Sequence, residues 1–293
     1  MLADLRSLLF VPADRPERYA RALASGADAV CIDLEDAVAA SARPAARACV
    51  VAHFLSTAES VGPLCGLRIN SLASRDGLRD IVALQDAGLR PGFVMLAKCE
   101  GASDMRLLAA QMPGVPLVAL IESVAGLQAA PAIAAAHPSV QGLLFGGADF
   151  SAEARCAMNW EALLLARSTL AHAAAQAGMA CLDVPFLDIT DPAGAQTEAA
   201  RAAALGYTGK ALIHPTQVAP VHAGFAPPPD AVERARRIVE AASGVAGAVQ
   251  LDGRMIDRPV VLAAQRLLRR AAVGGHDEAQ ESRSEHESPG ARA

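Results

Sequence analysis

The sequence predicts an α/β fold, a (β/α)₈ (TIM) barrel followed by a C-terminal helical lid extension. Apolar runs of strand length alternate with alanine-rich helical patterns, and eight such pairs fit between Arg6 and Ile213. Charged or polar residues follow strand after strand, at the rim where this fold carries its active site. An open doubly wound sheet is the alternative, but no GxGxxG motif follows the first expected strand.

In the first half of the chain, glycine and proline mark where the helices begin and end. A helix begins near Pro16 and stops at Gly26, and Gly88 closes another, because glycine readily adopts the left-handed conformation of a helix end. The expected strands are Arg6–Pro12, Ala29–Leu34, Leu64–Asn70 and Gly92–Lys98, with later helices over Ala45–Leu55, Gly77–Ala87 and Ser103–Gln111.

Two-residue alternation supports the second and third strands. Asp33 and Glu35 share one face of the second strand, and Arg68 and Asn70 share one face of the third. Their apolar neighbours occupy the opposite faces. We therefore expect the polar set to line the barrel mouth and the apolar set to contact the helices.

The fifth and sixth strands are expected within two apolar runs, each of which ends in a carboxylate. Glu122 closes the run Pro116–Ser123, and Asp149 closes the run Gly142–Phe150. An unpaired carboxylate at the end of a buried strand costs several kcal/mol of desolvation, and a divalent cation would offset that cost. The sequence therefore predicts Glu122 and Asp149 as ligands of Mg²⁺, which prefers oxygen donors; no His or Cys accompanies them to favour zinc.

The barrel is completed by two more pairs, and the pattern changes after His214. The expected elements are the helices Leu127–Ala136, Trp160–Ala177 and Ala193–Leu205 and the strands Ala180–Phe186 and Gly209–Ile213. A proline-rich linker then leads to helices over Ala231–Ala242 and Val260–Ala272. We predict a barrel over residues 1–220, a linker and lid over 221–273, and a disordered tail over 274–293.

Composition excludes several classes of function. Of the 293 residues 53% are hydrophobic, which is ample for a sizeable core. The net charge of -5, without a basic stripe, argues against a nucleic-acid partner. The six cysteines lack a CxxC pair, as expected of reduced thiols. No stretch is long enough to span a bilayer and no signal peptide is evident, so we expect a cytoplasmic protein.

Seven short motifs, in order from Arg6 to about Ala272, resemble the citrate lyase β-subunit-like branch of the HpcH/HpaI aldolase family. Each motif alone is weak, whereas seven in register are specific. They are RSLLFVP (6–12), DLEDAV (33–38), LRIN (67–70), IES with Gly126 (121–126), FGGADF (145–150), GKALIHP (209–215) and GRMID (253–257).

The resemblance implies a reaction and a set of roles. Members cleave or form a carbon–carbon bond between a short acyl thioester, usually acetyl-CoA, and a 2-oxo acid. Glu122 and Asp149 match the ligands of Mg²⁺, with Mn²⁺ as an alternative ion, and Arg68 matches the arginine that binds a carboxylate. Asp257 matches the catalytic carboxylate on a lid that often closes over a neighbouring subunit, so a homo-oligomer, trimer or hexamer, is expected.

Alternatives remain for several residues. Arg68 also suits an ion pair with Glu35 or Asp36, and Asp257 also suits a helix N-cap before Pro259, with Asp252 as the fallback acid. The family places Arg6 near the substrate or thioester, and a rim salt bridge is the alternative. His214 and Asp33 are expected to be structural.

The remaining candidates are assigned supporting roles. Glu35 and Asp36 are expected to orient metal-bound water, and Lys98 to pair with Glu35 or balance charge. Gly146, Gly147 and Ala148 would offer backbone N–H groups to a small acid.

The expected activity is that of a lyase acting on a citryl-, citramalyl- or malyl-CoA type thioester. A CoA-independent 2-oxo-acid aldolase, an acyl-CoA thioesterase and the β subunit of a citrate lyase complex stay open as alternatives.

Overall fold

The structure is a computed structural model that describes residues 2–57, 62–245 and 247–286, with side chains described up to Ala272. The chain divides into two compact units, Met1–Phe225 and Ala226–Ala293. The boundary predicted at residue 220 falls inside helix α9 (Val218–Phe225), which belongs to the first unit. Each unit has an apolar core of its own.

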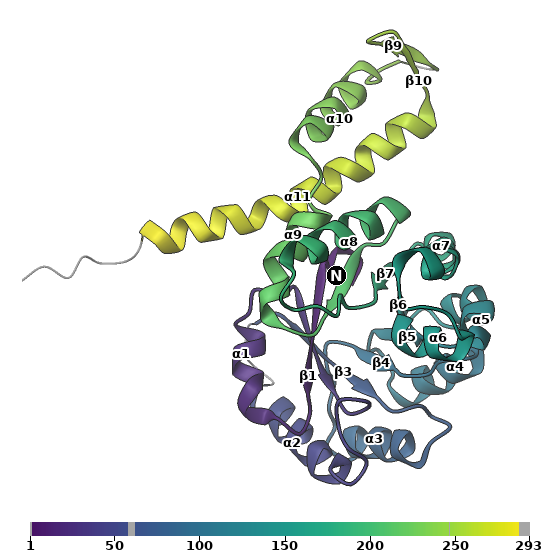
Figure 1. Ribbon diagram of the computed structural model, residues 1–293, viewed down its shortest axis with the longest axis vertical. Helices are drawn as coiled ribbons and strands as arrows, with labels where there is room; N and C mark the ends of the chain where they lie inside the picture. The colour runs from purple at the N-terminus through teal and green to yellow at the C-terminus, as the bar shows by residue number, and fades with distance from the viewer. Residues whose placement is uncertain (1, 58–61, 246, 287–293) are drawn as a thin grey trace, which may run out of the picture. The chain divides into compact units, whose positions relative to one another are not determined.

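The first unit is a closed barrel of eight parallel strands in sequence order, which confirms the predicted fold (Figure 1). Strand β8 returns to β1 through the pairs Ser7↔Lys210 and Leu9↔Leu212. The strands are β1 (Ser7–Pro12), β2 (Ala29–Asp33), β3 (Leu64–Ile69), β4 (Val94–Leu96), β5 (Leu117–Ile121), β6 (Val140–Phe145), β7 (Ala180–Asp183) and β8 (Gly209–Leu212). Because the strands are parallel, their carboxyl ends meet at one rim.

Helices connect the strands around the barrel (Figure 1). They are α1 (Tyr19–Leu23), α2 (Arg43–Ser56), α3 (Arg75–Asp86), α4 (Ala102–Gln111), α5 (Val124–Ala134), α6 (Gly147–Ala154), α7 (Trp160–Ala177), α8 (Pro192–Leu205) and α9, with 3₁₀ turns η1 (Leu2–Asp4), η2 (Pro16–Arg18) and η3 (Pro215–Gln217). Side chains of Ser123, Asn159 and Asp191 cap helix starts, and left-handed Gly178 and Gly206 end α7 and α8. No helix of the described ranges is both long and apolar enough to cross a bilayer.

Strand side chains alternate between two apolar layers. One layer fills the barrel interior and includes Cys31 and Phe93, and the other packs against the helices and includes Ile32 and Leu34. This confirms the alternation predicted for β2. Gly66 on β3 makes room for the interior ring of Phe93, because a Cβ there would lie 2.4 Å from it.

A buried ion network lies between strands β7 and β8 and the helices α7 and α8. It consists of Arg167, Asp183, Glu198 and Lys210. Asp183 accepts hydrogen bonds from Arg167 Nε at 2.8 Å and from Lys210 Nζ at 2.6 Å. Lys210 Nζ also donates to Glu198 Oε1 at 2.6 Å. Two carboxylates therefore meet two cations, and the charges of the network balance.

The chain after β6 departs from the prediction. The sequence predicts one strand-length run from Gly142 to Phe150, but β6 ends at Phe145 and α6 begins at Gly147. Consecutive glycines are poor strand residues and permit the turn into the helix. Asp149 therefore lies in the first turn of a helix rather than at the end of a strand.

The second unit consists of two helices and a β-hairpin that the sequence did not predict as such. Its elements are α10 (Pro229–Ala241), β9 (Val249–Leu251), β10 (Arg254–Ile256) and α11 (Arg258–His286). The hairpin turns at Asp252 and Gly253, which have φ of 50° and 73° and suit a two-residue turn with left-handed backbone. The core of the unit is formed by Ala235, Ile238, Ile256 and Ala264.

The tail predicted to be disordered, residues 274–293, is described only in part. Its backbone continues α11 as far as His286, a longer helix than the expected Val260–Ala272. Residues 287–293 lie outside the described residues. A disordered end to the chain stays a prediction for those last positions.

Candidate metal centre at the carboxyl rim of the barrel

Three carboxylates from separate parts of the sequence meet at the carboxyl rim. Asp36 follows β2, Glu122 follows β5, and Asp149 lies in α6 after β6. One ligand oxygen from each lies within 4.8 Å of the other two. Glu122 and Asp149 therefore lie as close together as the sequence predicted. Asp36 joins them, although the sequence assigned it only to orienting water.

The start of α6 places Asp149 beside Glu122. A carboxylate in the first helical turn is stabilised by the positive end of the helix dipole. Gly146, the residue before the helix, lies directly against Glu122: a Cβ there would be 2.4 Å from the Glu122 Cβ and 2.9 Å from its Oε2. Only glycine fits at this position without moving the carboxylate.

The backbone donors predicted over residues 146–148 need one correction. The N–H of Gly146 donates to the carbonyl of Ile121 at 2.9 Å, so it is already used to hold the β5 and β6 ends together. Gly147 and Ala148 are the first two residues of α6, and a helix leaves such N–H groups without an intrahelical acceptor. Of the three predicted N–H donors, only those of Gly147 and Ala148 therefore remain for a ligand.

Lys98 provides positive charge beside the three carboxylates. Its Nζ lies 2.5 Å from Glu35 Oε1, 3.6 Å from Asp36 and 3.8 Å from Asp149. Its backbone N–H donates to Glu122 Oε1 at 2.7 Å, from a left-handed residue with φ of 52°. Lys98 therefore contacts the acidic group through both backbone and side chain, beyond the pairing with Glu35 that the sequence predicts.

Arg68 is held to the barrel wall by Asp33. The guanidinium donates to both Asp33 oxygens, at 2.6 Å from Nε and 2.5 Å from Nη2, and β2 and β3 place the two residues opposite each other. Its remaining nitrogen, Nη1, lies 3.3 Å from Glu35 Oε2. Asp33 is thus structural, as predicted, and the ion pair left open for Arg68 is present.

Burial and like charges perturb the proton affinities of the acidic group. Burial, together with the carboxylates of Glu35 and Asp149, raises the pKa of Glu122 to about 8, although the hydrogen bond from Lys98 and the charge of Arg68 oppose this. Burial also raises the pKa of Glu35, although Arg68 and Lys98 oppose this. For Asp36 burial is outweighed by the hydrogen bond with Glu35 and by the charges of Arg68 and Lys98, so its pKa is lowered.

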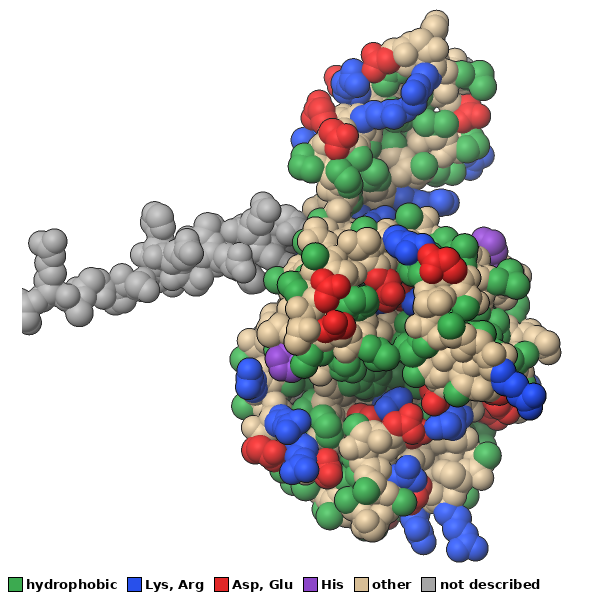
Figure 2. All heavy atoms as spheres, viewed as in Figure 1, with side chains coloured by type: hydrophobic (Ala, Val, Ile, Leu, Met, Phe, Trp, Pro, Cys, Tyr) green, Lys and Arg blue, Asp and Glu red, His purple; other side chains and the backbone are tan. Residues whose placement is uncertain are grey.

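Negative charge is in excess at this rim. Five carboxylates face the cations of Arg68 and Lys98; the five are Asp33, Glu35, Asp36, Glu122 and Asp149. When all are ionised the group carries a net charge of about -3, five minus two. Figure 2 shows acidic and basic side chains together beside a hollow of the barrel unit. All the donors are oxygens, which suits a hard divalent cation such as Mg²⁺.

Arg6 is not part of this group, which corrects its expected place near the substrate. Arg6 precedes β1 and so lies at the amino end of the strands, opposite the rim. Its guanidinium donates to both oxygens of Asp28, at 2.8 and 3.2 Å. The ion pair with Asp28, the residue before β2, accounts for an arginine at this position without a ligand.

Two further residues have local structural roles. His214 accepts a hydrogen bond from the N–H of Thr216 and caps η3, as expected of a structural His-Pro pair. Asp257, in the second unit, caps α11 by accepting from the N–H of Val260 at 3.3 Å. The cap that the sequence left open for Asp257 is therefore present, and its catalytic role stays a prediction.

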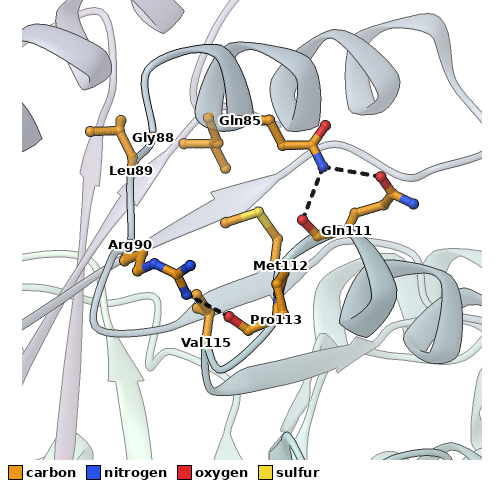
Figure 3. A pocket seen from close by; sticks show the side chains of 9 residues that line it. Gln85, Gly88, Leu89, Arg90, Gln111, Met112, Pro113 and Val115 are labelled. Carbon is orange, nitrogen blue, oxygen red and sulfur yellow. Dashed lines mark hydrogen bonds between the residues drawn. The ribbon is translucent and has the colours of Figure 1, made fainter.

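Two cavities differ in their relation to the rim. One of about 310 Å³ is lined by Lys98, by Ser71 from the loop after β3, and by Ser103 and Asp104 from the first turn of α4. The other, of about 210 Å³, is lined by Arg90 and the ends of α3 and α4, at the amino end of the strands (Figure 3). Its polar groups bond to one another, as Gln85 does to Gln111, and no carboxylate lines it. Only the first cavity adjoins the acidic group.

A closed (β/α)₈ barrel with reactive side chains at the carboxyl rim is the architecture of the TIM-barrel enzymes. Residues 6–215 match the family described as HpcH/HpaI aldolase/citrate lyase, and residues 166–276 match the C–C bond lyases of the TIM-barrel fold. The chain belongs to the HpcH/HpaI aldolase/citrate lyase family.

Relatives extend the match over nearly the whole chain. The citrate lyase subunit beta-like protein of Mycobacterium tuberculosis (strain ATCC 25618 / H37Rv) is 38% identical over 270 residues, 90% of this chain and 94% of that protein. Citrate lyase subunit beta of Escherichia coli (strain K12) is 34% identical over 287 residues, 92% and 94% of the two chains. A crystal structure of CitE from Mycobacterium tuberculosis, in complex with magnesium, acetoacetate and coenzyme A, matches with a TM-score of 0.80 and 35% identity, covering 93% of this chain and 100% of that chain.

Proposed function

We propose that this chain is a Mg²⁺-dependent carbon–carbon lyase. Its substrate is a 3-hydroxyacyl-CoA of the citryl-, citramalyl- or malyl-CoA type, and its products are acetyl-CoA and a 2-oxo acid. The observation that carries the proposal is the convergence of Asp36, Glu122 and Asp149 within 4.8 Å at the carboxyl rim. Family membership supports the reaction class, and the magnesium and coenzyme A in the related CitE structure support the ion and the thioester.

Glu122 and Asp149 would hold the ion, with Asp36 as a third ligand or as the acceptor of a bound water. A cation would offset the burial and the repulsion between carboxylates that together raise the pKa of Glu122. When bound, Mg²⁺ supplies positive charge that polarises the hydroxyl and carboxylate of the substrate. Glu35 and Lys98 would keep the ligands and their waters in place.

The chain's own donors would orient the 2-oxo acid. Arg68 presents Nη1 toward the rim while Asp33 fixes the rest of the guanidinium, so its position is set before a ligand arrives. The N–H groups of Gly147 and Ala148 at the start of α6 suit a carboxylate oxygen. The cavity of about 310 Å³ beside Lys98 has room for a small acyl group.

Asp257 would supply the proton that completes cleavage. As the carbon–carbon bond breaks, the substrate hydroxyl gives up its proton to solvent water, its carbon becomes the ketone of the 2-oxo acid, and the bonding electrons form the enolate of acetyl-CoA. A carboxylic acid near the methyl carbon donates a proton to that enolate, and in the synthetic direction its carboxylate removes the proton. The acid belongs to the second unit, at the start of α11.

The β subunit of a citrate lyase complex is a second candidate, favoured by the name and identity of the Escherichia coli relative. Such a subunit would act on a substrate attached to an acyl carrier. The purified chain separates the two candidates, since turnover of free acyl-CoA is expected only of the first. A trimeric or hexameric assembly and a cytoplasmic location remain predictions.

Calorimetry tests the binding half of the proposal. We expect oxaloacetate, pyruvate or glyoxylate to bind in the presence of Mg²⁺ and to bind far more weakly in EDTA, and we expect the matching CoA thioester to be cleaved. Release of free CoA without acetyl-CoA would indicate a thioesterase, and turnover without CoA would indicate a simple aldolase. Equal binding of the 2-oxo acid with and without Mg²⁺ would contradict the assignment of a metal to the site.

Variants at Asp257 test the cleavage half. Asp257→Ala and Asp257→Ser both remove the acid, but serine keeps the helix cap. We expect both to lower turnover about 10²–10⁴-fold, while Mg²⁺-dependent binding of the 2-oxo acid is unchanged. Normal turnover by Asp257→Ser would show that Asp257 is only a cap.

A further inference from the structure

A pocket in the second unit is lined by three arginines and one aspartate. Arg234 and Arg237 lie one turn apart on α10, and Arg254 and Asp252 belong to the β9–β10 hairpin. The pocket encloses about 320 Å³ and lies wholly within the second unit. Figure 2 shows basic side chains gathered on this unit. We call this cavity the arginine pocket.

The fold directs the three guanidinium groups to one place. Residues three apart on a helix share a face, so Arg234 and Arg237 point to the same side of α10. Arg254 has the same parity on β10 as the buried Ile256, whereas Met255 between them is 71% exposed. Arg254, although its side chain is exposed, therefore lies on the same face of the hairpin as Ile256 and lines the pocket that the α10 arginines also line.

The charges of the arginine pocket do not balance. Arg237 pairs with Asp252, Nη2 to Oδ2, at 3.0 Å. Among the described residues, Arg234 and Arg254 have no acidic partner within 4.0 Å, although Arg236 on the same helix pairs with Glu233. Three arginines and one aspartate leave a net charge of about +2, three minus one. Gathering like charges on a small unit is unfavourable unless an anion occupies the space between them.

Guanidinium groups match the oxygens of phosphate in both charge and geometry. A phosphate monoester or a diphosphate carries close to two negative charges at neutral pH, which equals the excess in the pocket. Leu251, Ile238 and Ile256 complete the lining of the pocket, while the three arginines and Asp252 are exposed, so an anion could reach them from solvent.

We propose that the arginine pocket binds the phosphate groups of a nucleotide, and that the nucleotide is the phosphorylated end of the CoA thioester. The choice of CoA rests on the proposed function. The binding of phosphate itself does not, because it follows from the charge and geometry of the second unit alone. The pocket would thus recognise the carrier of the acyl group, far along the substrate from the reacting carbons.

The test uses the full chain and two probes, adenosine 3′,5′-bisphosphate and inorganic pyrophosphate, titrated by calorimetry in EDTA to silence any metal site. We compare Arg234→Gln/Arg254→Gln with Arg236→Gln, a matched control on the same helix whose partner Glu233 lies outside the pocket. Loss of each charged contact should weaken binding about tenfold, so the double variant should lose about 100-fold. Circular dichroism and thermal melting check that both variants fold.

Equal binding of the probes by the double variant and the wild type would overturn the proposal, as would an equal loss in Arg236→Gln. Because the probes need no turnover, this arm gives its answer even when no thioester is cleaved. The second arm uses the thioester: the double variant should raise its KM about tenfold or more with kcat unchanged. Weaker probe binding with an unchanged KM would overturn the assignment to CoA.

Discussion

Two groups of charged side chains on the same barrel differ in how their charges are matched. In the buried ion network behind β7 and β8, Asp183 and Glu198 meet Arg167 and Lys210, and the bonds to Asp183 are 2.6 and 2.8 Å long. At the carboxyl rim, five carboxylates share two cations, and Glu122 has its pKa raised to about 8. The charges of the first group balance, whereas the second group is short of positive charge.

The difference separates a structural group from one prepared for a ligand. Burying a matched set of charges is tolerated because each partner replaces the lost water. Crowding carboxylates is tolerated only when something else supplies positive charge or protons. The surplus of negative charge, rather than burial or the number of ionisable groups, is therefore what supports the rim as the proposed binding site.

The largest expected effect comes from removing rim carboxylates. Glu122→Gln and Asp149→Asn should each lower Mg²⁺-dependent turnover about 10³-fold or more, because the ion supplies several kcal/mol to the reaction. Glu153→Gln is the matched control, since Glu153 lies on the same helix as Asp149 but outside the acidic group. Steady-state rates and Mg²⁺ calorimetry measure the effect. Full activity in either rim variant would remove the metal assignment.

The second effect falls on stability rather than activity. Lys210→Met leaves Asp183 and Glu198 short of a cation in the buried ion network, so the free energy of unfolding should fall by about 3–5 kcal/mol. Arg201→Ala, which removes the exposed pair with Glu161 and the contact of its guanidinium with the Trp160 ring, should cost much less. Urea unfolding measures both. A change in the Mg²⁺ affinity of folded Lys210→Met would contradict the separation of the two groups.

The third effect is a dependence on pH. The pKa of Glu122 rises on folding from 4.5 to about 8, so neutral Glu122 stabilises the metal-free protein below pH 4.5. That contribution is lost as the pH rises through about 8, with a slope of up to about 1.4 kcal/mol per pH unit in between. Glu122→Gln should flatten this slope in urea unfolding.

Mg²⁺ must displace the same proton, so its affinity should rise with pH by up to about tenfold per unit below pH 8. An affinity for Mg²⁺ that is constant from pH 6 to pH 8 would contradict the shift.

The smallest expected effect is on stability and comes from the left-handed backbone conformation of Lys98. Lys98→Gly and Lys98→Ala both remove the ammonium, but only glycine adopts a φ of 52° without strain. The glycine variant should therefore be more stable than the alanine variant by about 1 kcal/mol, and should keep the N–H bond to Glu122. Thermal unfolding of the pair measures this. Equal stabilities would show that the left-handed conformation at this position costs nothing.

The fold could be predicted from the sequence because its signals are local. Alternation in β2 and the helix ends predicted from Gly26 and Gly88 each depend on a few neighbouring residues. The start of α6 was missed because a short apolar run has no periodicity that separates a strand from a helix start, although Gly146 and Gly147 are poor strand residues. The β9–β10 hairpin was missed although Asp252-Gly253 is a recognised signal for a two-residue turn.

The site could be predicted in its composition but not in its geometry. Glu122 and Asp149 stood out because a carboxylate ends each run. The place of Asp36 beside them depends on the closure of the barrel, which no local pattern encodes. Arg6 was misplaced because the resemblance was followed although Arg6 begins the expected strand Arg6–Pro12, at the end opposite the rim, and Asp28 accounts for its charge.

In the chain, 86 positions separate Asp36 from Glu122, from 36 to 122, and 27 separate Glu122 from Asp149, from 122 to 149. Only the finished barrel brings the three carboxylates together. A half-formed barrel would lack at least one of them, so Mg²⁺ should have little affinity for early folding intermediates. The ion should then slow unfolding without speeding refolding, and its binding would report that the chain has closed upon itself.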